Sequence, residues 1–290
     1  MRPRSILLLL LLATQGWACS VPVFAYAIRR WPADPHYATV GSTQAAQALR
    51  TRLGMQAGAV FIEVDATVPQ DQVRLYFPQS DQRGKPWAEV PIAEIDPASL
   101  LSSPIRNRVR DLLVEGDSVV WLVVSSASAA QDAQAAAMLR GRLKILEGMV
   151  ALPELDREQA SVDRTLSVPA APLRIGFPVV EVDRRDPREH WLIRQIDAMP
   201  RSASAGPIVV PVFGQGRALA AIDGEFIRRD VIDDATTFLS GRCSCEIKDQ
   251  NPGYDLLMAG EWFDLMAAAA DRHAAASATA AASATGAAHP

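Results

Sequence analysis

The clearest pattern of apolar and polar residues lies between residues 118 and 241. Residues 118–124 form a near-continuous apolar run rich in valine, which is too short for a long helix and typical of a buried parallel strand. After this run, segments with the helical spacing of apolar residues alternate with segments that have the spacing of strands. The elements predicted in this half are strands at 118–124, 177–182, 207–213 and 217–222, with helices at 129–148, 187–199 and 230–240.

The first half of the chain predicts shorter elements. Apolar residues at Phe24, Ala27, Ile28 and Trp31 have helical spacing and indicate a short amphipathic helix. Strands are expected at 37–40, 59–65 and 72–77, and helices at 43–53 and 97–114. These elements would form a small α/β unit. Its arginine run, Arg106, Arg108 and Arg110, is expected on a solvated helix face.

The order strand, helix, strand, helix, hairpin, helix is that of the thioredoxin fold. We therefore expect an α/β protein with a thioredoxin-like domain at 116–265, preceded by the small α/β unit at 19–115. Pro207, just before the third strand, has a position similar to that of the cis-proline of thioredoxins. Two features depart from that family. Pro211 would remove a hydrogen-bond donor inside a central strand, and Ser125-Ser126-Ala127-Ser128 stands where a Cys-x-x-Cys motif belongs.

The start of the chain is predicted to be a signal peptide, residues 1–18. Arg2 and Arg4 precede a short apolar stretch that is too brief to cross a bilayer as a mature helix. Cleavage would leave Cys19 at the new N-terminus, and the sequence before it resembles a degenerate lipobox. Cys19 is then either lipidated, which would anchor the protein to a membrane, or free in a soluble exported protein. The expected location is the periplasm or a membrane surface.

Composition and charge narrow the choice of partners. The chain has 290 residues, of which 49% are hydrophobic and 21% charged, as in ordinary globular proteins. Its formal net charge of −4 becomes −6 when the two positive charges of Arg2 and Arg4 leave with the signal. No basic field would remain to hold a phosphate backbone, so nucleic acid is not an expected partner. The Ala-rich stretch at 266–290 is predicted to be a disordered tail.

Cys243 and Cys245 are the only reactive side chains that lie close together in the sequence. A Cys-x-Cys disulfide closes a small strained ring that is easily reduced, which suits an oxidant or isomerase acting on a thiol substrate. Alternatively, two thiolates at this spacing can converge on Cu(I), since soft sulfur prefers that ion. A third interpretation is that the pair has a structural or recognition role.

Three segments together resemble a family of exported bacterial proteins of unassigned activity, some of them thioredoxin-like. The segments are Cys19-Ser20-Val21-Pro22-Val23-Phe24 with Trp31, then Val212-Phe213-Gly214-Gln215-Gly216-Arg217-Ala218-Leu219, and lastly Cys243-Ser244-Cys245 with the following residues 246–253. The resemblance implies export and fold but no reaction. The function expected is therefore a binding or accessory module for an unknown protein partner, with no resident cofactor; the alternatives are thiol–disulfide exchange and copper binding or delivery through Cys243 and Cys245.

Other candidates carry less weight. The Gly214-Gln215-Gly216 turn has no strand-to-helix context, which indicates a hairpin rather than a phosphate loop. Glu181 and Asp183 alternate at a strand end and are expected to be solvated. His36 and His190 are isolated, and each is expected at the surface or hydrogen-bonded in the core, while His273 and His289 are expected to be tail residues.

Overall fold

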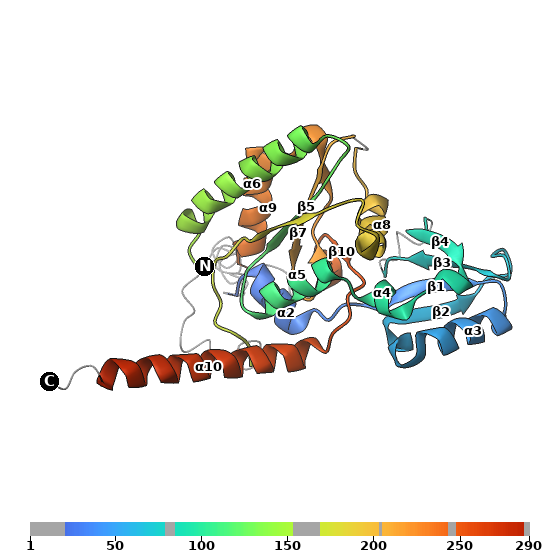
Figure 1. Ribbon diagram of the computed structural model, residues 1–290, viewed down its shortest axis with the longest axis horizontal. Helices are drawn as coiled ribbons and strands as arrows, with labels where there is room; N and C mark the ends of the chain where they lie inside the picture. The colour runs from blue at the N-terminus through green and yellow to red at the C-terminus, as the bar shows by residue number, and fades with distance from the viewer. Residues whose placement is uncertain (1–20, 79–84, 153–168, 203–204, 243–247, 287–290) are drawn as a thin grey trace, which may run out of the picture.

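The computed structural model describes residues 21–78, 85–152, 169–202, 205–242 and 248–286. It is a mixed α/β protein with two mixed sheets (Figure 1). The larger sheet contains β5 (Val120–Val124), β6 (Val179–Val182), β7 (Ile208–Phe213), β8 (Arg217–Ala218), β9 (Ile222–Asp223) and β10 (Tyr254–Asp255). The smaller sheet contains β1 (His36–Val40), β2 (Val60–Val64), β3 (Gln72–Tyr76) and β4 (Ala88–Pro91).

The strands of the larger sheet lie in the order β10-β8-β7-β5-β6, and β9 also pairs with β7. β5 runs parallel to β6 and antiparallel to β7. All of β5 is buried, because helices cover both faces of the sheet at its centre. The two strands predicted at 118–124 and 207–213 are neighbours in this sheet, with Leu122 opposite Val210.

Pro211 fits into β7 without weakening the ladder to β5. It lies opposite Trp121, and its carbonyl accepts a hydrogen bond from Leu219 N at 2.9 Å on the side away from β5. The N and C=O of one strand residue point to the same side, so the missing N–H also faces away from β5. On that side β8 and β9 pair only with the two ends of β7. The proline therefore lies in the part of β7 that pairs with β5 on one side but with neither β8 nor β9 on the other.

Helices cover the larger sheet on both faces. On one face lie α2 (Val23–Arg30), α6 (Ala129–Met149) and α9 (Arg229–Ser240), which bury Phe24, Leu139 and Leu239 against Trp121 and Phe213. The other face is covered by α5 (Pro104–Val114), α8 (His190–Ala198) and the first turns of α10 (Trp262–Gly286). The range 19–115 predicted for the small unit thus includes two helices, α2 and α5, that pack on the larger sheet.

The smaller sheet has the order β2-β1-β3-β4 and carries α3 (Thr43–Leu53). α3 begins as predicted, since Ser42 Oγ accepts from Ala45 N at 3.1 Å. The buried Leu49 of α3 belongs to the same apolar cluster as Leu122 and Trp191 of the larger unit. One continuous core therefore joins the two sheets. Short 3-10 turns complete the chain at Gly54–Ala59 (η1), Ile92–Glu94 (η3), Pro187–Glu189 (η4), Gly224–Phe226 (η5) and Lys248–Gln250 (η6).

The single helix predicted at 97–114 is two helices, α4 (Pro97–Leu101) and α5. Pro104 disfavours a helical conformation in the residue before it, and Ser103 is indeed extended. Ser103 Oγ then accepts from Arg106 N at 3.3 Å and caps α5.

Arg106 corrects the expectation of a solvated arginine face. Its side chain is buried, with 1% of the residue exposed, whereas Arg108 is exposed. The guanidinium donates to four carbonyl groups, those of Ser99, Leu100, Ser102 and Leu257. Burial lowers the pKa of Arg106 to about 10, so it remains charged at neutral pH. Arg106 therefore joins the end of α4 to the segment that leads into α10.

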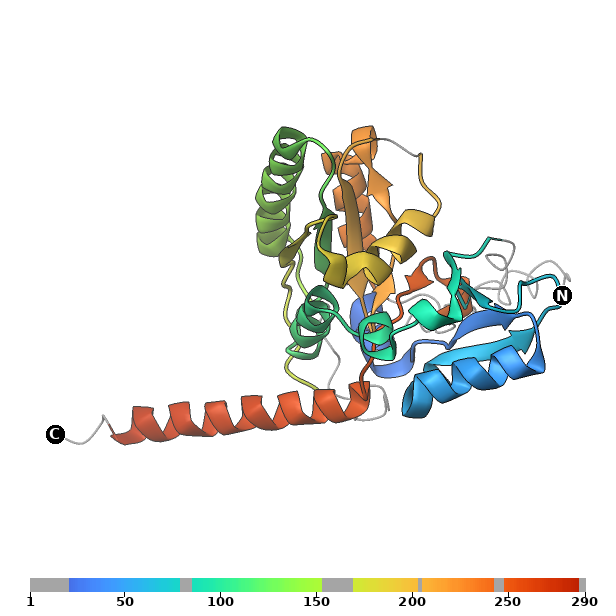
Figure 2. The ribbon, with the colours of Figure 1, turned by 45° about the vertical axis from the view of Figure 1, so that its right-hand side comes forward.

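The C-terminal stretch differs from the predicted disordered tail. α10 continues to Gly286 and projects from the rest of the molecule (Figure 2). Trp262, Met266 and Ala269 are buried, and His273 Nε2 lies 3.0 Å from Glu115 Oε2. Residues 274–281 are exposed. Alanine has the highest helix propensity, so the low-complexity composition also favours a helix.

Candidate functional site

The three cysteines chosen from the sequence, Cys19, Cys243 and Cys245, lie outside the described residues, and so does His289. The described chain resumes at Val21 after Cys19 and ends at Arg242 before Cys243. Pro22 and Arg242 form an isolated antiparallel bridge, and Val23 N donates to Gly241 O at 3.0 Å. The two chain segments that carry the cysteines are therefore joined at their described ends.

At the Ser125–Ser128 junction between β5 and α6, serine hydroxyls stabilise the start of α6. Ser126 Oγ donates to Asp132 Oδ1 at 2.6 Å, and Ser126 N donates to the same oxygen at 2.9 Å. Ser128 Oγ accepts from Gln131 N at 3.4 Å. This is a helix-capping arrangement, with a carboxylate in the first turn. The hydroxyls of Ser126 and Ser128 therefore serve the start of α6, while Ser125 Oγ accepts from Arg184 N at 3.0 Å.

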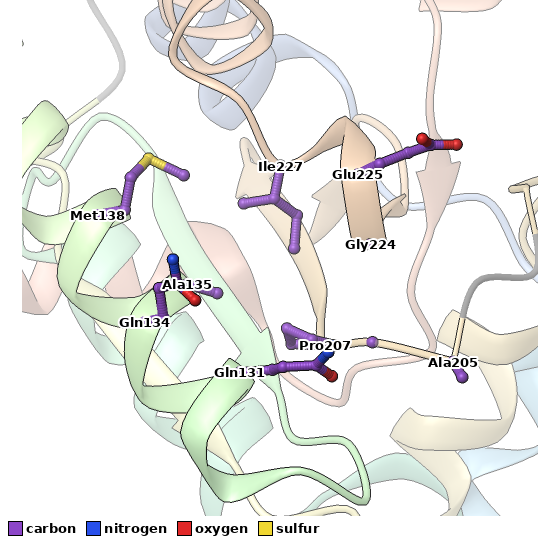
Figure 3. Close-up of a pocket in the computed structure, with 10 residues that line it drawn as sticks. Gln131, Gln134, Ala135, Met138, Ala205, Pro207, Gly224, Glu225 and Ile227 are labelled. Atoms are coloured by element: carbon purple, nitrogen blue, oxygen red, sulfur yellow. The ribbon is translucent and has the colours of Figure 1, made fainter.

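A pocket of about 490 Å³ opens beside this junction (Figure 3). Its walls come from three parts of the chain that are far apart in sequence. The first turns of α6 form one wall, the Gly206-Pro207 step before β7 forms the base, and the η5 turn with Ile227 forms the other wall. The pocket therefore lies at the end of the central strands where β5 leads into α6 and the chain enters β7.

The lining of this pocket is mainly apolar and amide in character. Ala135, Met138 and Ile227 supply apolar surface, while Gln131 and Gln134 supply amide groups. Glu225 is the only titratable residue among those that line it. Apolar and amide groups in one pocket can bind a ligand through both its carbon surface and its polar groups.

Ion pairs next to the pocket fix the loop that leads into Pro207. Arg184 donates from Nε to Ser125 O at 3.0 Å and from Nη1 to Asp197 Oδ2 at 2.6 Å. Arg201 links Asp197 to the buried Asp223, at 3.3 Å to each. These residues escaped sequence reasoning because they are scattered over 100 positions, and only the fold brings them together.

The similarity of Pro207 to a cis-proline is not matched, because the described residues contain no cis peptide bond. Pro207 nevertheless contributes to the pocket. Its carbonyl accepts from Gly224 N at 3.3 Å, which holds the η5 turn against the start of β7.

His36 is a hydrogen-bonded core residue, which is one of the two alternatives predicted for it. It is 1% exposed, its Nε2 donates to Asp255 O at 2.9 Å, and its Nδ1 accepts from Trp87 Nε1 at 3.2 Å. Burial lowers the pKa of His36 to about 4, so the ring is neutral at pH 7. His190 is exposed, with Nδ1 2.9 Å from Pro187 O.

The Asp255 carboxylate is the centre of a buried ionic cluster that the sequence did not suggest. It is 2% exposed and accepts from Arg217 Nη1 at 3.2 Å, from Lys248 Nζ at 2.5 Å and from Asp34 N at 3.1 Å. The cluster joins the entry to β1 with β8 and β10. By contrast, Glu181 and Asp183 are exposed, as predicted, and pair with Arg140 and Arg185.

A comparison with models of known protein families finds no match, and no curated protein matches the chain either. Within the described ranges, no group of three His, Cys, Asp or Glu side chains is placed to hold a metal ion. None of the helices in those ranges is both long and apolar enough to cross a membrane.

Proposed function

We propose that the protein is an exported thioredoxin-like binding module whose pocket between α6 and η5 holds an extended peptide segment of a protein partner. The arrangement of the central strands supports the thioredoxin-like part. The order β6-β5-β7-β8, with β5 parallel to β6 and antiparallel to β7, follows the strand order expected for that fold. α6 and α9 lie on one face of this sheet and α8 on the other.

The observation that carries the binding role is the pocket beside the Ser125–Ser128 junction. A volume of about 490 Å³ lies within the usual range for ligand pockets. Amide side chains such as Gln131 and Gln134 can pair with both the N–H and the C=O groups of a peptide. Met138 offers an adaptable apolar contact for side chains of different shape. Glu225 favours a peptide with a lysine or arginine at that end.

The test is selection of displayed random peptides on the purified protein. Wild type is expected to enrich peptides with an apolar residue next to a basic one. Ala135→Arg fills the pocket and should abolish enrichment. Ala137→Arg is the matched control, because Ala137 is exposed on the same helix and does not line the pocket. Gln134→Ala, an exposed position, provides a milder variant. Enrichment that survives Ala135→Arg would refute the proposal.

A second candidate function rests on the cysteines. Cys243 directly follows Arg242, and Cys19 is three residues before Pro22, the bridge partner of Arg242. We propose that Cys243 and Cys245 act together as a thiol pair. In a redox step, Cys243 and Cys245 would form a disulfide while a partner disulfide accepts two electrons and two protons and becomes two thiols.

Thiol counting before and after reduction, followed by Cu(I) titration, separates the cysteine alternatives. A redox pair should show two thiols only after reduction, and its potential should lie tens of millivolts above that of a structural disulfide. A copper site should take up one Cu(I) and lose it in Cys243→Ser or Cys245→Ser. A pair that is inert to both treatments excludes both.

Export and anchoring are part of the same proposal. The mature protein is expected to begin at Cys19, either free or acylated, and mass spectrometry of the native N-terminus distinguishes the two. A lipid on Cys19 would anchor the protein to the membrane surface. A protein that retains Met1 contradicts both versions.

A further inference from the structure

The turn between β7 and β8 is buried, although hairpin turns normally face solvent. Gly214, Gln215 and Gly216 are all buried, and both glycines have positive φ, +58° and +89°. A Cβ on Gly214 would lie 2.8 Å from Ala27 Cβ, and one on Gly216 would lie 2.7 Å from Met258 Sδ. The glycines therefore allow the turn to pack between α2 and the segment before α10.

This packing places Gln215 at the wall of a second pocket, about 270 Å³ in volume. Gln215 is 5% exposed, and its Nε2 donates to Ile28 O at 2.8 Å near the end of α2. Because Ile28 O can only accept, the amide must turn its nitrogen toward it. In the part of the chain that the structure describes, the Oε1 of Gln215 accepts no hydrogen bond. Gln215 Oε1 is not among the fully buried polar atoms that lack a partner, so solvent or a ligand in the pocket can reach it, and a ligand that donates could bind there.

The other groups at this pocket also favour a donor with positive charge. Asp34 and Glu261 line it, and none of the described residues that line it is a lysine or an arginine. Asp34 is already paired with Lys248 at 2.8 Å, whereas Glu261 makes no ion pair with any described residue. The neighbouring His36 is neutral at pH 7, since its pKa is about 4. The carboxylate of Glu261 is therefore the charge available to a ligand.

Aromatic and aliphatic side chains complete the pocket. Phe263 is 49% exposed, and its ring, like that of Trp262, can contact a cation or its carbon stem. Leu257 and Met258 supply aliphatic surface. We propose that this second pocket binds a guanidinium or alkylammonium group on a short apolar stem, with Gln215 Oε1 and Glu261 as acceptors. The site is separate from the peptide pocket beside α6, and neither proposal depends on the other.

The guanidinium or alkylammonium group could belong to a free small amine or to the side chain of an arginine or lysine in a protein. NMR titration of the full chain with ethylguanidine, its neutral isostere ethylurea and the peptide acetyl-Gly-Arg-Gly-amide distinguishes them. Ethylguanidine should shift the side-chain amide signals of Gln215 and the indole signal of Trp262, and ethylurea should bind at least about tenfold more weakly. Tighter binding of the peptide than of ethylguanidine identifies a protein source, and the reverse order a free amine.

Two variants, one at Glu261 and one at Gly58, test the pocket without disturbing the core. Glu261→Gln should weaken ethylguanidine binding about tenfold or more, whereas Asp271→Asn, an equal loss of charge at an exposed position further along α10, should leave it unchanged. Gly58 lines the pocket, and a Cβ there meets nothing within 4 Å, so Gly58→Phe is expected to fold and to block binding. Equal binding of ethylurea and ethylguanidine, or full binding by Glu261→Gln or Gly58→Phe, would overturn the proposal.

Discussion

Asp255 and Asp197 each bind two cationic side chains, but they do so at different depths. Asp255 is 2% exposed and holds Arg217 and Lys248 at 3.2 and 2.5 Å. The side chain of Asp197 is 34% exposed and holds Arg184 and Arg201 at 2.6 and 3.3 Å. Because the ion-pair contacts are alike, the difference in burial decides how much stability is lost when one partner is removed. Removing one partner in the interior leaves a charge without compensation, whereas water replaces a partner lost near the surface.

The largest expected effect comes from Asp255→Asn. It leaves the buried Arg217 without a carboxylate and Lys248 with only the half-exposed Asp34, and we expect the free energy of unfolding to fall by about 3–5 kcal/mol. Denaturation in urea measures it. The triple variant Arg217→Met, Lys248→Met, Asp255→Leu should be more stable than Asp255→Asn, because no buried charge is left over. A loss below about 1 kcal/mol for Asp255→Asn would end the contrast between the two clusters.

The next effect concerns pH and the histidine that borders the Asp255 cluster. The pKa of His36 is about 4 in the folded protein, against 6.5 for an exposed histidine, because burial disfavours the charged ring. Between these values the unfolded state binds a proton that the folded state does not. The free energy of unfolding therefore decreases as the pH falls from 6.5 to 4, by about 3 kcal/mol at most from this group.

Urea denaturation at pH 4, 5, 6 and 7 tests the histidine effect against His36→Gln. This variant keeps a donor and an acceptor but does not titrate. Its stability should change less over that range than that of wild type, and the difference between the two curves isolates His36 from the carboxylates. Parallel curves for the two proteins would show that His36 is not the group responsible.

A smaller effect is expected from Asp197→Asn. Water reaches this cluster, so the loss of stability should be about 1 kcal/mol or less. The change should act instead on the loop at 200–207, which Arg201 ties to Asp197 and Asp223, and should weaken binding of the peptides selected on the wild-type protein. A stability loss comparable to that of Asp255→Asn would remove the distinction drawn from burial.

The smallest effect is expected for Arg228→Gln. Arg228 pairs with Asp230 at 2.8 Å, and both side chains are more than half exposed. The hydrogen bond to Asp230 raises the pKa of Arg228. Because water solvates both side chains, the loss of the ion pair should hardly change the free energy of unfolding. The melting temperature should match that of wild type within error at 0.15 M salt, which makes this variant the baseline for the other three.

The elements that the sequence determined are those whose cause is local. Ser42 fixes the start of α3 through its own hydroxyl, and the valine-rich run at 118–124 becomes a buried strand because its side chains must leave water. The split at Pro104 could also have been foreseen, since a proline restricts the residue before it wherever it stands. For α10, disorder was inferred from low complexity, although the alanine content itself favours a helix.

Only the tertiary structure decided which polar residues are buried and what lies next to them. Arg106 and Arg108 look alike in sequence, yet one is in the core because four carbonyls left by the end of α4 and by residue 257 meet at its position. Asp255 faces Arg217 and Asp34, which are 38 and 221 residues away, and Gln215 faces the second pocket because two glycines let a turn enter the interior. Such contacts depend on how distant segments pack, and no local pattern of apolar and polar residues encodes that packing.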